Sequence, residues 1–344
     1  MSTTTLVAPS AQPRVTRIVT AITRSRELAI ALVLVVILLA ATTKRHTFLF
    51  SHDGWRDTLL SPSILLVLAI GEMVVIVTRN VDLSVGSTLG ISAYVTGKIF
   101  IAHPGIPLIA VFVAGLLVGA VLGAINGLLV TIFKVPALVI TLGTLYIYRG
   151  FLTHELGSGR INADDFPANF QKLGTQQILT IPVLTLIGLF ALVLVGYYLQ
   201  TARGGRELYA VGSDPDAAVL YGLPTGRRVF GAFVLCGSLA GLAGVFSVAR
   251  YATAFSGTGL NLELQAVAAV VIGGVAIFGG SGTVWGAAIG AFLLITIDRA
   301  LPILGISDFW QGAVVGALIL GSICLDRLLS MRRTHRLIEA RDDA

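Results

Sequence analysis

The chain has 344 residues, of which 55% are hydrophobic and only 12% are charged, and its mean hydropathy is +0.89. Soluble domains carry about 25% charged residues, so this composition excludes a soluble, disordered or fibrous protein and predicts one that the lipid bilayer solvates. The net charge of +6 could indicate a nucleic-acid partner, but the arginines cluster outside the apolar runs. This distribution follows the positive-inside rule, so it predicts cytoplasmic termini and argues against nucleic-acid binding.

Apolar runs recur along the chain at the length of about 20 residues that a transmembrane helix needs. We expect an all-α polytopic fold with about ten transmembrane helices, some of them broken. They cover residues 28–43, 62–78, a third run that follows a polar patch at 79–87 and lasts to about 102, then 105–133, 137–151, 178–200, 229–250, 262–278, 284–301 and 309–325. A single transmembrane domain at 27–330 then lies between cytoplasmic tails at 1–26 and 331–344.

A polar segment at residues 202–228 interrupts the apolar pattern with four arginines and three acidic residues. Asp214 suits an N-cap, Pro215 the first helical position and Asp216 the first turn, so the sequence predicts a short helix that ends near Gly222. A span count of ten with both termini inside places this loop in the cytoplasm. A short polar helix on the surface of a membrane protein needs a soluble partner to contact.

Three further segments, at 80–87, 134–144 and 256–265, bring polar or helix-breaking residues into apolar runs. Non-helical backbone at membrane depth is tolerated where protein buries it or where it lines a cavity, and broken helices often frame a transport route. Asp82 and Glu263 either line such a route or only cap helices, and the mid-span Glu72 must face protein or water. The candidate pathway residues are Asn80, Asp82, Ser84, Asn126, Thr141, Thr144 and Glu263.

Glycines at every fourth position, as at 115, 119, 123 and 127, place small residues on one helix face. Such a face allows close helix packing, which we expect within the chain rather than across a dimer seam. No Walker A, G-x-S-x-G or H-E-x-x-H sequence occurs, and the two cysteines have no metal or disulfide spacing. We therefore expect no catalytic, cofactor or metal site, and any ATP hydrolysis must occur on another chain.

Five stretches together resemble the membrane subunits of ribose-type bacterial ABC sugar importers. They are Thr78-Arg-Asn-Val-Asp-Leu-Ser-Val-Gly-Ser87, Asn126-Gly-Leu-Leu-Val130, Val135-Pro-Ala-Leu-Val-Ile-Thr-Leu-Gly-Thr144 with Tyr148-Arg-Gly150, Gly205-Arg-Glu-Leu-Tyr-Ala-Val-Gly-Ser-Asp-Pro-Asp-Ala-Ala218 and Ala269-Val-Val-Ile-Gly-Gly-Val-Ala-Ile-Phe-Gly-Gly-Ser-Gly-Thr-Val284. The resemblance runs in order over about residues 28–330 and implies a permease of the ribose and branched-chain type in a bacterial inner membrane.

The same resemblance implies the partners of the chain: a second permease subunit, identical or different, cytoplasmic ABC ATPase subunits and an extracytoplasmic sugar-binding protein. It also implies that the polar loop is the coupling helix on which each ATPase docks, through polar contacts of Arg206, Glu207, Asp214 and Asp216. The full set of implied coupling residues is Gly205, Arg206, Glu207, Tyr209, Asp214, Asp216, Ala217, Ala218 and Gly222.

The substrate is less well defined than the class. Residues 249–254 and 300–311 resemble permeases of rhamnose uptake, which favours rhamnose or a ribose-like monosaccharide. Related permeases for the furanosyl autoinducer and for branched-chain amino acids share the broken-helix layout and stay open as alternatives. An ion-coupled secondary sugar carrier is the alternative from another class, although three membrane carboxylates are few for an ion relay.

Overall fold

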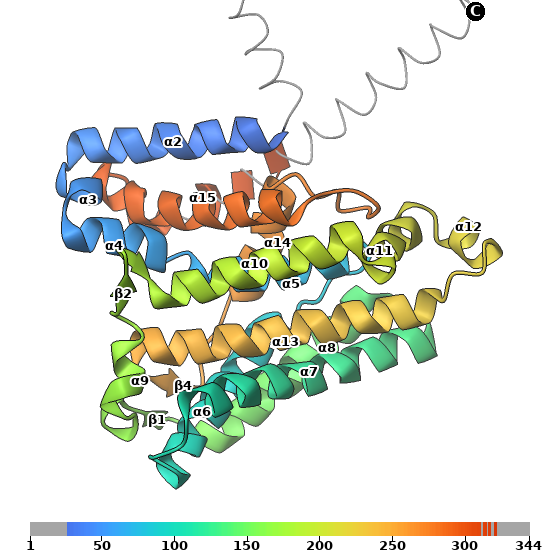
Figure 1. Ribbon diagram of the computed structural model, residues 1–344, viewed down its shortest axis with the longest axis horizontal. Coiled ribbons are helices and arrows are strands. Elements are labelled where there is room, and N and C mark those ends of the chain that lie inside the picture. Colours follow the sequence, from blue (N-terminus) through green and yellow to red (C-terminus); the bar gives the residue numbers. More distant parts are fainter. Residues whose placement is uncertain (1–25, 311, 315, 318–319, 322–344) are drawn as a thin grey trace, which may run out of the picture.

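The computed structural model describes residues 26–310, 312–314, 316–317 and 320–321 and is built almost entirely of helices (Figure 1). The nine long or apolar helices are α2 (Arg26–Lys44), α5 (Ser63–Ile76), α6 (Val85–Ala102), α7 (Leu108–Phe133), α8 (Ala137–Leu156), α10 (Val183–Thr201), α13 (Thr225–Tyr251), α14 (Leu262–Ile272) and α15 (Val284–Ile303). They correspond in order to the first nine expected spans. Residues 311, 315, 318–319 and 322–325 of the tenth, expected at 309–325, lie outside the described residues.

Seven helical segments in the described part are long and apolar enough to cross a membrane, one of them being α4 and α5 together at His52–Ile76. Several of the predicted helix ends were wrong. Helix α14 stops at Ile272 rather than at 278, because a run of glycines with positive φ follows it. Helix α10 begins at Val183 rather than at 178, because residues 177–182 form a tight hairpin.

The short elements gather at the two ends of the long helices (Figure 1). Helices α11 (Arg203–Ser213) and α12 (Pro215–Leu220) lie at one end, which we call the α12 end. The opposite end carries α3, α4, α9 and two small antiparallel sheets. Their bounds are α3 (Thr47–Phe50), α4 (His52–Leu60), α9 (Ala168–Lys172), β1 (Arg160–Ile161) with β4 (Ala254–Phe255), and β2 (Gln177–Ile178) with β3 (Ile181–Pro182), beside the 3-10 turns η1 (Ala163–Asp165) and η2 (Asp308–Trp310).

Helix α13 lies at the centre of the bundle and packs most extensively against α7, α5 and α6. The glycine faces explain how closely α7 and α13 approach: a methyl group added at Gly119 would overlap the carbonyl oxygen of Gly237, and one at Gly115 would contact Val245 and the Gly241 carbonyl. The expectation of packing within the chain is therefore confirmed for these glycines. The outward face of α7 carries large apolar side chains such as Ile109 and Leu117, as a lipid-facing surface requires.

Three irregular segments interrupt the helices inside the bundle. Residues 77–84 join α5 to α6, residues 252–261 join α13 to α14, and residues 273–283 join α14 to α15. The first and third segments touch, because the Gly280 amide donates to the Val77 carbonyl over 2.9 Å. The second segment packs on the first turn of α6, where Gly259 with φ +80° leaves no room for a side chain beside Gly86. All three breaks are thus in contact with other elements of the bundle.

Candidate functional site

The loop between α10 and α13 has the local structure that its sequence predicts. The Asp214 carboxylate accepts a hydrogen bond from the Ala217 amide over 3.0 Å, and Pro215 occupies the first turn of α12. The helix ends at Leu220, and Gly222 makes the following turn with φ +73°. A capping carboxylate and a fixed proline φ both favour this start, which is why six residues suffice for a defined helix.

Two of the charges expected to face a partner, Glu207 and Arg206, also make contacts within the chain. Glu207 is buried and accepts from Arg203 Nε over 2.7 Å and from Arg228 Nε. These hydrogen bonds from Arg203 and then Arg228 lower the pKa of the Glu207 carboxyl below its ordinary value. Arg206 donates to the Thr201 carbonyl over 2.7 Å, although its side chain is exposed. These contacts fix α11 against the end of α10 and the start of α13.

The apolar members of the predicted set pack inward. Gly205 lies so close to α10 that an added methyl group would overlap the Tyr198 carbonyl. The Tyr209 hydroxyl donates to the Gly282 carbonyl over 3.1 Å, and burial raises the pKa of this tyrosine. Ala218 is buried and Ala217 is half-buried, whereas Asp216 is exposed. Helix α12 therefore presents Asp216 and its C-terminal end outward.

Arg79 is a site residue that the candidate set omits. Its guanidinium donates through Nε to the Gly212 carbonyl and through Nη2 to the Ser213 carbonyl, each over 2.5 Å. Arg79 itself has φ +65°, an uncommon conformation for a residue other than glycine. It joins the α5–α6 break directly to the last residues of α11. An arginine at the end of an apolar span is typical of a residue that faces the membrane surface. The sequence around Arg79 therefore did not predict this contact.

The polar residues of the α5–α6 break form a buried cluster. Asp82 Oδ1 accepts from the Ser84 amide over 2.9 Å and from the Ser84 hydroxyl over 2.7 Å, and Asn126 Nδ2 donates to the Ser84 oxygen over 2.7 Å. Glu72 Oε1 accepts from the Asp82 amide over 3.0 Å. All four side chains are buried within one chain. Asp82 therefore shapes the turn before α6, while Ser84 occupies the cap position without a side-chain cap bond.

Two threonines and an asparagine extend this arrangement. The Thr141 hydroxyl donates to the Val81 carbonyl over 3.1 Å, and the Thr144 hydroxyl donates to the Thr141 carbonyl over 3.2 Å. Asn80 is half-buried and donates to the Thr78 carbonyl. Six of the seven candidate pathway residues thus gather around residues 77–84. Asn80, Asp82 and Thr141 satisfy backbone groups of that break, which a dry interior requires. Asn126 instead bonds the Ser84 side chain, and Thr144 bonds within α8.

Glu263 lies apart from this cluster, at the start of α14. Its carboxylate sits against Gly86, where an added methyl group would overlap Oε2. The residue that precedes α14 is Asn261, with φ +66° and no side-chain cap bond. Arg149 Nη1 fixes the preceding segment by donating to the Ser256 and Thr258 carbonyls over 3.0 and 2.7 Å.

Comparison with known proteins identifies the class to which this architecture belongs. Residues 56–323 match the family described as branched-chain amino acid transport system / permease component, and the chain belongs to that family. It is therefore a transport subunit of an ABC importer, multi-pass in the inner membrane.

Individual relatives within this family are similar over most of their length. It is 36% identical over 278 residues to the autoinducer 2 import system permease protein LsrC of Yersinia pseudotuberculosis (serotype O:3, strain YPIII), covering 80% of this chain and 78% of that protein. The LsrC protein of Enterobacter sp. (strain 638) is also 36% identical, over 275 residues, with 80% and 79% covered. No solved structure is significantly similar. The expected class is confirmed, whereas these comparisons do not single out rhamnose or ribose.

Proposed function

We propose that this chain forms the translocation pathway of an ATP-driven importer of a small sugar, together with a second permease subunit, and that a separate cytoplasmic ATPase docks on α12. An extracytoplasmic binding protein would deliver the substrate. ATP binding and hydrolysis on the partner would switch the permease between outward-facing and inward-facing states. The observation that carries this proposal is the exposed apolar end of α12.

Helix α12 is capped and short, and it projects from the end of the bundle (Figure 1). The side chains at its C-terminal end, Val219, Leu220 and Tyr221, are 59%, 87% and 86% exposed. Three neighbouring apolar side chains on a solvated tip mark a surface that a partner covers. Arg203, Arg206, Arg227 and Arg228 surround the same loop, and under the positive-inside rule they favour the cytoplasmic side, where ABC ATPases reside.

A displacement of α12 would reach the helix breaks through covalent and hydrogen-bonded neighbours. Only Asp214 separates α12 from Ser213, and the Arg79 guanidinium donates to the Gly212 and Ser213 carbonyls. The Tyr209 hydroxyl meanwhile holds Gly282 in the α14–α15 break. Movement of the docking segment would therefore pull on two of the three irregular segments, which are the parts of the bundle most able to change conformation.

For the substrate we propose the monosaccharide class, with the furanosyl autoinducer ahead of rhamnose because the LsrC relatives are named autoinducer 2 import permeases. The branched-chain amino acids stay an alternative through the family description. Calorimetry of the partner binding protein with each of the three ligands separates these substrates. Heat release with leucine alone would contradict the sugar assignment.

Charge reversal at the docking loop tests the mechanism. In Arg206→Glu and Asp214→Lys variants we expect normal membrane insertion, loss of ATPase co-purification and loss of sugar uptake. The matched control is Arg160→Glu, another exposed arginine, at the opposite end, and this variant should co-purify with the ATPase normally. Sugar accumulation that survives ATP depletion but collapses with the proton gradient would instead indicate an ion-coupled carrier.

Sidedness is measured separately with Tyr221→Cys, in a background where Cys236 and Cys324 are replaced by serine. A membrane-impermeant thiol reagent should label this cysteine in inside-out vesicles and leave it unlabelled in intact cells. Labelling from outside the cell would refute a cytoplasmic docking loop.

A further inference from the structure

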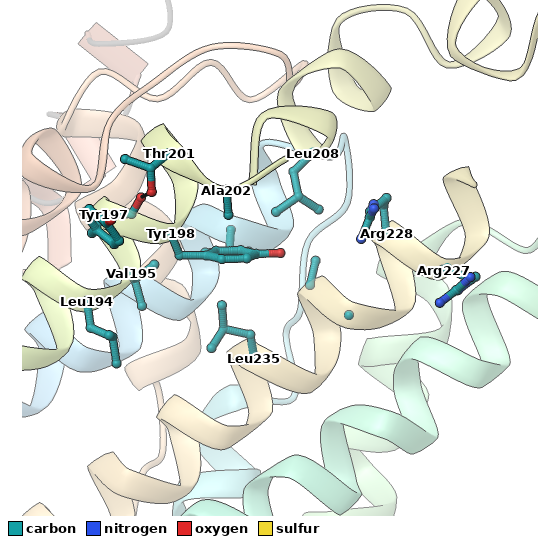
Figure 2. A pocket seen from close by; sticks show the side chains of 13 residues that line it. Leu194, Val195, Tyr197, Tyr198, Thr201, Ala202, Leu208, Arg227, Arg228 and Leu235 are labelled. Atoms are coloured by element: carbon teal, nitrogen blue, oxygen red, sulfur yellow. Dashed lines mark hydrogen bonds between the residues drawn. The ribbon is translucent and has the colours of Figure 1, made fainter. Parts of the chain in front are cut away.

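A pocket of about 480 Å³ opens between α10 and α13 at the α12 end (Figure 2). Buried side chains form its floor and inner wall: Val74 of α5, Val195 of α10, Leu208 of α11 and Ala232 of α13. Leu194 lies on the α10 rim and is 57% exposed. The volume of the pocket lies in the range of small-molecule sites, and its walls are almost entirely apolar.

The pocket has a polar end and an apolar end. Figure 2 shows Arg227 and Arg228 on the side where α13 begins, with Leu194, Val195 and Leu235 on the other side. The Tyr198 ring extends across the pocket with its hydroxyl toward the arginines (Figure 2). A ligand that matches this lining carries an anionic group at one end and a hydrocarbon chain at the other.

The positive charge at the polar end is not balanced within the described part of the chain. Glu207 pairs with Arg203 and with Arg228, so one carboxylate serves two guanidinium groups. Arg227 is exposed and makes no hydrogen bond or ion pair with any described residue. Its guanidinium is therefore available to an anion that lies at the mouth of the pocket, where a bidentate contact to a phosphate suits its geometry.

We propose that this pocket binds an anionic phospholipid, with one acyl chain along the apolar walls and the headgroup phosphate at Arg227. Basic pockets between transmembrane helices on the cytoplasmic side suit acidic lipid headgroups, and each arginine near such a surface contributes to the attraction. The arginine at one end and the hydrocarbon lining at the other favour a lipid over a helix of a second subunit, which would bring a broad apolar face and no anion.

The lipid would touch the loop that the proposed function assigns to coupling. Leu208 of α11 lines the pocket, and Glu207 beside it holds Arg228 on the facing helix. An occupied pocket therefore holds α11 against α10 and α13. Lipid binding is measured without ATPase or sugar, so its failure leaves the coupling proposal intact, and failure of coupling leaves the lipid site intact.

Two substitutions separate the polar and apolar halves of the site. Arg227→Gln removes the free cation and, as an exposed surface change, leaves the fold intact. Gly231→Phe fills the pocket, because Gly231 lines it and no atom lies within 4 Å of an added methyl group. The matched controls are Arg160→Gln at the opposite end and Gly143→Phe on α8, where an added methyl group also meets nothing within 4 Å.

The experiment is native mass spectrometry of the full-length permease taken from nanodiscs of phosphatidylcholine containing phosphatidylglycerol, with a titration of phosphatidylglycerol in detergent. We expect the unmodified permease to retain phosphatidylglycerol selectively. Arg227→Gln should raise the dissociation constant about fivefold, the factor for one arginine–phosphate contact. Gly231→Phe should abolish retention of the lipid, and neither control should change it.

Equal retention of the two lipids, or unchanged binding in both variants, would overturn the proposal. Displacement of phosphatidylglycerol by millimolar inorganic phosphate would reduce the pocket to an anion site and overturn the lipid assignment. A dimer that dissociates on Gly231→Phe while no lipid is retained would assign the pocket to subunit contact and also overturn it.

Discussion

Removal of the Arg79 side chain should disconnect the docking loop from the α5–α6 break. Arg79→Ala deletes two hydrogen bonds, to the carbonyls of Gly212 and Ser213. A hydrogen bond to a charged group contributes about 1.5–3 kcal/mol, and we take about 1.5 kcal/mol for the pair because Arg79 is exposed. That free energy corresponds to about a tenfold weaker linkage between the two segments.

The backbone of Arg79 provides an internal control for stability. With φ +65° the residue is in the left-handed region, which costs a residue with a Cβ about 1–2 kcal/mol and glycine very little. Arg79→Gly should therefore lose the two bonds yet recover most of the stability, whereas Arg79→Ala should be destabilised. If the Arg79 hydrogen bonds couple the docking loop to the α5–α6 break, both variants should lose transport to the same extent.

The assay is sugar uptake per ATP hydrolysed in proteoliposomes that contain the permease, its ATPase and its binding protein. We expect about a tenfold fall in both Arg79 variants with ATPase binding retained, and an intermediate value for Arg79→Lys. Normal uptake per ATP in Arg79→Gly, with a defect only in Arg79→Ala, would show that stability rather than linkage was lost and would refute the reasoning.

Three further outcomes follow from the contacts described above. Gly119→Leu should lower the melting temperature in detergent, because overpacking costs about 1–3 kcal/mol. Gly143→Leu, at an open position, should leave the melting temperature unchanged. Equal melting temperatures of the two variants would contradict the close α7–α13 contact. Asp214→Ala should weaken ATPase binding because it removes the helix cap, which stabilises α12 by about 1 kcal/mol. Asn also caps helices, so Asp214→Asn should bind the ATPase more tightly than Asp214→Ala. Equal losses of ATPase binding in the two variants would show that the charge of Asp214, and not its cap, is needed. Because the pKa of Glu207 in the folded state lies below its ordinary value of 4.5, its ion pairs should protect α11 from hydrogen exchange at neutral pH. That protection should be lost as the pH falls through the lowered pKa. Glu207→Gln should abolish that pH dependence, and an unchanged profile in this variant would point to another group.

Local signals made part of this site predictable from sequence. Asp214 and Pro215 specify the start of α12 through interactions within four residues, so no knowledge of the remaining chain is needed. The four-residue spacing of Gly115 and Gly119 likewise defines one face of α7. The partner of that face on α13 could not be assigned, because spacing gives a surface and not its neighbour.

Contacts between distant segments were not predictable in the same way. The Arg79 side chain bonds residues more than 130 positions away, and its positive φ is chosen by those contacts and not by its own residue type. Glu72 was expected to face protein or water, and its carboxylate accepts from the Asp82 amide over 3.0 Å and from the Cys236 thiol over 3.8 Å. The first partner is a backbone group and the second is on a distant helix, so no local side-chain pattern encodes either. The lipid pocket also depends on how α10 and α13 diverge, which is a property of the assembled bundle.

The distribution of rigid and irregular backbone limits where motion can occur. Helices α7 and α13 meet backbone to backbone at Gly119 and Gly237, and such a close-packed pair moves as one body because small displacements would produce overlap. The breaks at 77–84 and 273–283 are close to the end of α11 as well, since a methyl group added at Gly212 would overlap the Val77 carbonyl and one at Gly280 would overlap Ser213. They are also joined to each other by the hydrogen bond from the Gly280 amide to the Val77 carbonyl. A push on α12 would therefore reach both breaks first, because Gly212 and Ser213 contact them directly. The buried polar cluster around Asp82 stabilises the α5–α6 break through hydrogen bonds. The candidate pathway residues in this cluster therefore stabilise the conformation of that break.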